Sequence, residues 1–441
     1  PSAGGGDGGI GRTNISGAGW YGSCWQYRKK LTLNASLVEA DATDFPVLIS
    51  LADDSDLAAG AQSDGDDILF TSADGATQLD HEIEEYTAVA KDIKIATGTF
   101  TTPASTGTDS ITGVGFQPKA IYLWGTAVTD ESVSVHSAQW IGFADDATPT
   151  RNQKVVAVTG EDGYADPDTY RSPAEDANAV LYILNEDGDD GSPPDPIAVA
   201  TISSYDSDGF TLNYTTASPA SGDYIVHYVA YGGDDLQAYV GQSAANASPV
   251  SDVPFRPELV FVTTACNAPT NGNAYGNQSF GVFNDDLNQW WVGSDQGYNN
   301  DSEDDKDSVL RTGAFIGQMY LAGGSTWEIS LSSITDTGFA WTGSNTDVFN
   351  YLALNLSGLD TFVGNFTKET TGADPVSQEL PDFGFTPGFY MLASGSEVNE
   401  TRTTPNNSRV TLGAYDGTTQ HSTTRTDEMF DPPGAGPQNA D

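Results

Sequence analysis

The chain has 441 residues, of which 62 are Asp or Glu and 17 are Lys or Arg, so its formal net charge is −45. This charge excludes binding to nucleic acid or to anionic membranes through the surface, because both need clustered Lys and Arg. Apolar residues make up 38% and aromatic residues 10% of the chain, which is enough to build cores and excludes an intrinsically disordered protein. The length predicts about three domains.

Residues 1–23 are a Gly-rich leader that carries large apolar side chains at Ile10, Ile15 and Trp20. Its Gly6–Gly11 segment matches G-x-G-x-x-G, but no strand precedes it, so we do not expect a dinucleotide-binding loop. The opening Pro-Ser-Ala-Gly is typical of a processed end, and the lack of a signal peptide therefore does not exclude secretion. No run reaches the ~18 apolar residues of a membrane span.

Residues 24–95 are expected to form a small β domain. The motifs in residues 25–86 are, in order, WQYRKKLTL, TDFPVLISL, DGDDILFT, DGATQL and HEIEEY. This order resembles a domain of unknown function common in secreted and surface-anchored prokaryotic proteins, often beside concanavalin-like lectin modules. The resemblance implies a secreted or surface protein and assigns no catalytic residue. The strands that usually close that domain, with their Tyr-Tyr-Gly stretch, are replaced here by the start of a repeat.

The rest of the chain contains a repeat whose first landmark is an aromatic residue, one further residue, Pro and an apolar run. The three copies are Phe116–Trp124, Phe255–Thr263 and Phe385–Ala393. Each predicts a turn that Pro fixes, followed by a buried strand. A second landmark, with Gly as its second residue, follows in every copy, at Ile141–Asp146, Phe280–Asp286 and Leu412–Asp416.

Two further landmarks occur only in the first two copies. A Gly-Phe strand lies within Ser207–Tyr214 and Asp336–Trp341, and a Tyr- or Phe-rich strand lies at Tyr224–Ala230 and Val348–Leu354. We therefore expect the third copy to form an incomplete sheet with an unpaired edge. Either a longer natural chain or another molecule would supply the missing strands.

Short apolar runs between Gly, Asp, Asn and Pro clusters predict an all-β fold of tandem antiparallel β-sandwiches, of the jelly-roll or immunoglobulin-like kind. The repeat strands also resemble those of tail and surface proteins of viruses that infect prokaryotes. The expected segments are the leader 1–23, the small β domain 24–95, the repeats 96–239 and 240–362, and a partial repeat with an extended tail, 363–441.

Asparagine bears on the compartment, because ten N-x-S/T sequons occur, whereas about four are expected by chance. They lie at Asn14, Asn34, Asn213, Asn246, Asn277, Asn300, Asn355, Asn365, Asn399 and Asn406. Two interpretations remain open. The chain is either a Ser- and Thr-rich β-protein whose count is inflated, or an extracellular protein that is glycosylated if its host is an archaeon or a eukaryote.

The acidic residues allow three interpretations, of which the first is salt adaptation, because Asp outnumbers Glu by 46 to 16 and high salt screens such charge. The second is calcium binding, because Asp and Asn in Gly-rich loops supply the oxygen ligands that calcium prefers. The third is solubility alone, with solvated acidic turns. The candidate calcium ligands are Asp64, Asp66, Asp67, Asn185, Asp187, Asp189, Asp301, Asp304 and Asp305.

No catalytic residue or organic cofactor is predicted. The chain lacks a G-x-S-x-G motif, its four His lack metal-ligand spacing, and with 62 acidic residues close carboxylate pairs arise without function. His227 lies in a repeat strand, where we expect it to pack. The two Cys, Cys24 and Cys266, exclude a disulfide-rich scaffold and a thiolate metal site and leave one candidate disulfide.

Trp290 and Trp291 are candidates for stacking on sugar rings, and burial in a core is the alternative. Because side chains alternate along a strand, one ring is expected on each face.

These features favour an extracellular structural protein that builds a surface filament, a sheath or a virion appendage. Its expected partners are copies of itself, joined head to tail when the leader of one copy adds a strand to its neighbour. A carbohydrate-binding adhesin, with glycans as partners, is the alternative, and a secreted glycan hydrolase is the third hypothesis.

Overall fold

The computed structural model describes the chain in two compact units, Pro1–Lys91 and Asp92–Asp441. Among the described residues, no helix has the length and apolar character needed to cross a membrane. The described residues are 29–32, 46–51, 57, 61, 65, 67–84, 92–129, 137–148, 151–160, 169–171, 178–184, 196–217, 223–243, 246–265, 278–295, 307–318, 327–343, 348–356, 358–367, 380, 383, 385–395 and 407–428.

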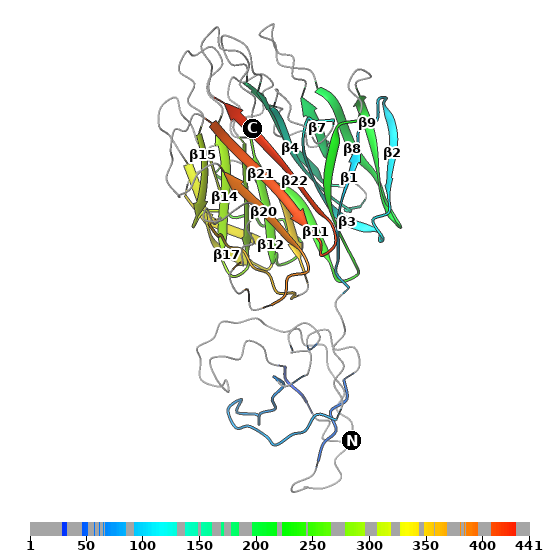
Figure 1. Cartoon of the computed structure of the whole chain (residues 1–441). Coiled ribbons are helices and arrows are strands. Elements are labelled where there is room, and N and C mark those ends of the chain that lie inside the picture. The colour runs from blue at the N-terminus through cyan, green and yellow to red at the C-terminus, as the bar shows by residue number, and fades with distance from the viewer. Residues whose placement is uncertain are drawn as a thin grey trace, which may run out of the picture. The chain divides into compact units, whose positions relative to one another are not determined.

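The second unit is all-β, and its named strands pair only in antiparallel fashion (Figure 1). The predicted fold class is thus confirmed. The strands are β1 (Lys94–Thr101), β2 (Gly107–Thr112), β3 (Pro118–Thr126), β4 (Ser137–Asp145), β5 (Gln153–Gly160), β6 (Thr169–Arg171), β7 (Leu181–Leu184), β8 (Pro196–Asp206), β9 (Gly209–Ala217), β10 (Ile225–Gly232), β11 (Gln237–Ser243), β12 (Leu259–Thr264), β13 (Gln278–Asn284), β14 (Gln289–Asp295), β15 (Asp307–Thr312), β16 (Ile316–Gln318), β17 (Trp327–Thr335), β18 (Gly338–Thr342), β19 (Phe349–Asn355), β20 (Tyr390–Gly395), β21 (Asn407–Tyr415) and β22 (Gln420–Glu428).

Each repeat contributes one main sheet. The first sheet has the order β1-β10-β3-β4-β5-β6, the second has the order β11-β19-β12-β13-β14-β15, and the third has the order β20-β21-β22. The first and second sheets have matching strand order, so β3, β12 and β20 correspond, as do β4, β13 and β21. Register supports this match, because Leu123, Val262 and Leu392 each lie opposite the Gly of the second landmark.

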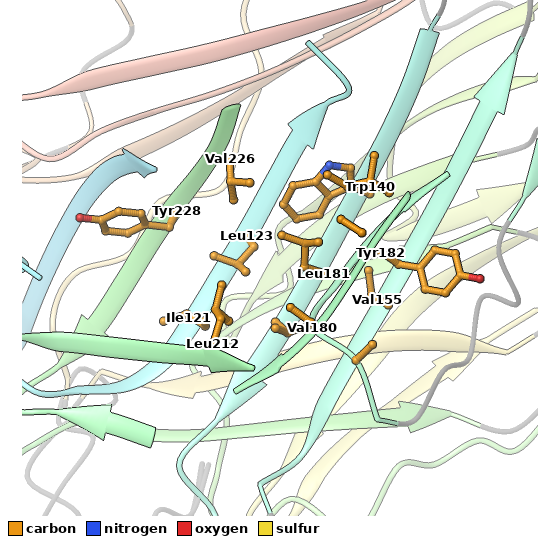
Figure 2. Close-up of a cluster of buried hydrophobic side chains, with 14 of the residues drawn as sticks. Ile121, Leu123, Trp140, Val155, Val180, Leu181, Tyr182, Leu212, Val226 and Tyr228 are labelled. Atoms are coloured by element: carbon orange, nitrogen blue, oxygen red, sulfur yellow. The ribbon is translucent and has the colours of Figure 1, made fainter. Parts of the chain in front are cut away.

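Two smaller sheets cover the outer faces of the first and second sheets. The order β2-β9-β8-β7 covers the first, and β16-β17-β18 covers the second. Figure 2 shows the resulting core of the first sandwich, where Leu123, Trp140 and Val155 pack with Leu181 and Leu212 of the covering sheet. Side-chain alternation explains this geometry, because it directs Leu123 of β3, Trp140 of β4 and Val155 of β5 to the face that the cover occupies.

The inner faces of all three main sheets meet in one shared core. Corresponding positions of the first core strand supply Tyr122, Phe261 and Met391, which is partly buried. The second strand supplies Phe143, Val282 and Ala414, which are all buried. The rings of Tyr122 and Phe261 lie 5.7 Å apart, centroid to centroid, edge to face. The three repeats therefore pack together as one compact unit around a shared apolar core.

The first unit contains a turn that its own side chains stabilise. Thr71 and Gln78 form an antiparallel bridge. Between them, Asp74 Oδ1 accepts hydrogen bonds from the backbone N–H groups of Ala76 and Thr77, both at 2.9 Å. Because an Asp before Gly is favoured in tight turns, this short segment forms where the Asp-Gly motif predicts a turn.

Candidate functional site

The three repeats are tied together by side chains at one corresponding position, the end of the second core strand. Asp145 Oδ2 accepts a hydrogen bond from the backbone N–H of Val240, which begins the second repeat, at 2.7 Å. Asn284 Nδ2 donates to the carbonyl oxygen of Thr361, two residues before the third repeat begins, at 3.4 Å. We call these junctions seams.

The third seam joins the third repeat to the first. Asp416 Oδ2 accepts hydrogen bonds from the backbone N–H of Thr97 at 2.9 Å and from its hydroxyl at 3.1 Å. Burial opposes ionisation of Asp416, but the N–H groups of Thr97, Thr419 and Thr418 outweigh it and hold the pKa of that carboxyl well below its ordinary value. The third sheet is thus fixed in place by charge-assisted bonds.

The inner face of the third sheet is buried, like the inner faces of the other two main sheets. Leu412 is fully buried, and Val410 and Ala414 are exposed by only 5% and 4%. The face of the third sheet that meets the shared core is thus fully packed. Among the described residues, its outer face and the edge at β20 have no neighbouring strand.

In the part of the chain that the structure describes, no sheet covers the outer face of the third sheet, whereas the other two main sheets are covered. Leu392 is 41% exposed, whereas Leu123 and Val262 at the same position are fully buried. Tyr390, two residues earlier on this face, is 38% exposed. In Figure 1 the orange and red strands β20, β21 and β22 lie in front of the other sheets. The outer face of the third sheet thus presents two large apolar side chains to the solvent.

A glycine marks where the covers approach most closely. A Cβ atom at Gly142 would overlap the carbonyl oxygen of Val180, and one at Gly281 would overlap that of Phe315. Val180 directly precedes β7 of the first cover, and Phe315 directly precedes β16 of the second. The third sheet keeps this glycine as Gly413, yet the nearest atom to its Cβ position is a carbonyl oxygen of its own sheet, His421 O at 3.1 Å.

A glutamine marks the second contact with the covers. Gln153 Oε1 accepts a hydrogen bond from the backbone N–H of Ile202 at 2.9 Å, and Gln289 Oε1 accepts one from Leu331 at 2.7 Å. Both donors belong to covering strands, β8 and β17. The third sheet also keeps this glutamine, as Gln420, and its side chain is exposed. The third sheet therefore retains both docking positions of its relatives without a described cover.

One edge of the third sheet is open as well. In the first sheet β3 lies between β10 and β4, and in the second β12 lies between β19 and β13. Within the part of the chain that the structure describes, β20 pairs with β21 alone. Edge strands present unpaired N–H and C=O groups that can accept a further strand.

A cluster of rings lies at the seam between the first and third repeats. His227 is 9% exposed and stacks on Trp124, with 5.3 Å between ring centroids, and the ring of His421 on β22 lies 5.5 Å from it. Burial, with a smaller contribution from His421, lowers the pKa of His227 to about 4. The expectation that His227 packs within the fold is confirmed.

Four of the ten predicted glycosylation sites lie among the described residues. Asn246 and Asn365 are exposed, and Asn213 is partly buried on β9. Asn355 is also partly buried and donates a hydrogen bond from Nδ2 to the carbonyl oxygen of Arg256 at 3.1 Å. The other candidates lie outside the described residues: Asn14, Asn34, Asn277, Asn300, Asn399 and Asn406.

Most candidate calcium ligands also lie outside the described residues, as do Cys24 and Cys266. Asp67 is described, and among the described residues no group of three or more His, Cys, Asp or Glu side chains is placed to hold a metal ion. The candidates outside are Asp64, Asp66, Asn185, Asp187, Asp189, Asp301, Asp304 and Asp305.

Trp290 and Trp291 lie on opposite faces of β14, as alternation predicts. Trp290 is partly buried against the shared core, with its ring 5.8 Å from that of Phe280. Trp291 is 1% exposed and packs with Ala314. Trp291 therefore has no open ring face for a sugar.

The docking glycine and glutamine were not recognised from the sequence. The glycines were visible in the second landmark, but the loop from Gly142 to Gln153 is longer than that from Gly413 to Gln420, so the glutamines do not align by counting. Register identifies them, because Gln153, Gln289 and Gln420 each begin the strand that pairs with the second landmark.

Comparison of the chain with protein families and with curated proteins finds no match.

Proposed function

We propose that the chain is an extracellular structural protein, the subunit of a surface filament, a sheath or a virion appendage. In this proposal a segment of one copy supplies strands that the third repeat of the next copy lacks. The observation that carries the proposal is the third sheet, whose inner face is buried while, among the described residues, no strand covers its outer face or pairs with the free edge of β20. Exposed sequons at Asn246 and Asn365 support the extracellular assignment.

Assembly of this kind has a defined symmetry. The acceptor is the third sheet and the donor is a different segment, so the contact joins unlike surfaces and propagates instead of closing as a pair. Backbone hydrogen bonds along an added strand would supply affinity, and alternate side chains would supply specificity. The hydrogen bonds at the seams already join the three repeats to one another within one chain. They are therefore not available for joining copies.

Electron microscopy of the native material tests the proposal. At native salt we expect regular polymers in negative stain. A monodisperse monomer at every salt and calcium concentration would contradict the proposed function.

Salt dependence is part of the same proposal. Lowering ionic strength from 1 M to 0.01 M lengthens the Debye length from ~3 to ~30 Å and exposes the self-repulsion of a chain with charge −45. We expect the melting temperature to fall on desalting and millimolar calcium to restore part of it. A melting temperature that changes with neither ionic strength nor calcium would contradict both salt adaptation and calcium binding.

A further inference from the structure

The covering strands of the first two repeats share a spacing around their turn. The backbone N–H of Ile202 donates to Gln153, and Ile202 precedes Gly209 by the same number of residues as Leu331 precedes Gly338. Gly209 and Gly338 occupy the turns with φ of 152° and 144°, which L side chains rarely adopt. The turn therefore requires Gly.

A large apolar residue follows each turn at a second fixed spacing. Leu212 follows Gly209 by the same number of residues as Trp341 follows Gly338. The side chains of Leu212 and Trp341 are both buried against the sheet that they cover. An apolar donor, a turn Gly and a large apolar residue thus define a covering segment for this kind of sheet.

The leader repeats both spacings. Ile10, Gly17 and Trp20 are separated as Leu331, Gly338 and Trp341 are. The leader departs from the pattern at Ala18, where the covers have Phe. Gly17 nevertheless allows the same turn, and Ile10 and Trp20 supply the two apolar positions.

Charge also favours the leader as the covering segment. Within residues 1–23 the single Asp7 and the single Arg12 cancel, whereas the chain as a whole carries −45. Bringing a neutral segment onto a strongly acidic neighbour costs little Coulomb repulsion, in contrast to most other segments of this chain.

We propose that the outer face of the third sheet binds residues 10–20 of a second copy as two antiparallel strands. The backbone N–H of Ile10 donates to Gln420 Oε1, and Trp20 covers Leu392. This inference rests on the proposed function and names the donor and the acceptor atoms of that assembly.

The test uses a synthetic peptide of residues 8–23 as the probe. The acceptor is the full chain carrying Ile10→Asp and Trp20→Asp, which disables its own leader. We expect the peptide to bind and the same peptide with both Asp substitutions not to bind. On the acceptor, Gly413→Val should weaken binding by about tenfold or more, because a side chain there would project from the face that the peptide covers. Gln420→Ala, or N-methylation of Ile10 in the peptide, should weaken it by about threefold to tenfold.

Matched controls separate loss of the site from loss of the fold. Gln237→Ala changes an exposed Gln on β11, outside the third sheet, and should leave binding unchanged. Equal melting temperatures of the Gly413→Val variant and the unchanged acceptor would show that the sheet remains folded. Absence of peptide binding, or binding that Gly413→Val and Gln420→Ala leave unaltered, would overturn the inference.

The outcomes distinguish this inference from the function on which it rests. Regular polymers of the native chain without peptide binding would contradict the leader contact while leaving assembly in place. Peptide binding together with a native chain that stays monomeric would support the site and contradict the assembly. In the native chain, occlusion of the peptide site that does not depend on protein concentration would show that each leader binds its own chain and would overturn the second-copy source.

Discussion

The first and third sheets are built from corresponding strands and differ in what lies on their outer faces. Both send alternate side chains into the shared core, and both hold the next repeat through an Asp at the end of the second core strand. Yet Leu123 is fully buried under a cover, whereas Leu392 is 41% exposed. The same strand pattern thus forms a finished sandwich in one place and an open surface in the other.

This difference shows that the inner and outer faces of these sheets are independent. The inner face needs only the other two repeats, because the seams and the shared core complete it. In the first two repeats the outer face is covered by strands that, apart from β2, lie later in the chain than the second core strand. Retention of Gly413 and Gln420 on an open face indicates that the third sheet keeps the positions by which a cover docks.

The largest expected difference comes from truncating the same position in both sheets. Leu123→Ala should lower the free energy of unfolding by about 2–5 kcal/mol, because it leaves a cavity in a closed core. Leu392→Ala in the monomer should lower it by less than about 1 kcal/mol, because the side chain is already partly in water. Urea unfolding measures both, and equal losses would show that the outer face of the third sheet is covered within the chain.

The second test concerns pH and compares the first and second repeats. His227 has a pKa of about 4 in the folded chain, below its ordinary value of 6.5. The folded state therefore resists protonation, and its stability is full above pH 6.5 and falls as the pH drops from 6.5 towards 4. The loss is about 3 kcal/mol at most.

The second repeat supplies the control for this pH effect, because Asn350 occupies the position that His227 occupies in the first. The His227→Asn variant should lose the part of the acid destabilisation that His227 causes. Unfolding free energies of the two proteins, measured from pH 7 to pH 4, give this part as a difference in slope. Parallel curves would contradict the buried, neutral state of His227.

The third test exchanges the residues of two seams. Asp145→Asn should destabilise the chain by about 2 kcal/mol, because the amide nitrogen cannot accept the N–H of Val240. Asn284→Asp should cost about 1–2 kcal/mol, because a carboxylate oxygen would then face the carbonyl oxygen of Thr361. Thermal unfolding of both variants checks this, and a neutral effect of the pair would mean that the seams do not join the repeats.

Local structure was predictable from the sequence, whereas the arrangement of the sheets was not. Pro-led strands such as Phe116–Trp124 and the incomplete third repeat are visible because apolar alternation and turn residues act over a few positions. The shared core was missed because alternation shows that Tyr122 and Leu123 face opposite sides but not what each side meets. The docking glutamines were missed because turn lengths differ between repeats.

Oxidative footprinting of assembled and dissociated protein shows whether the copies join at the outer face of the third sheet. Tyr390 and Leu392 are exposed on the outer face of the third sheet, and Leu287, at 43% exposed in the turn between β13 and β14, is an internal reference outside that sheet. We expect assembly to lower the oxidation of Tyr390 and Leu392 several-fold while Leu287 reacts as before. Unchanged oxidation of Tyr390 and Leu392 in regular polymers would show that the copies join elsewhere and would contradict a contact at the third sheet.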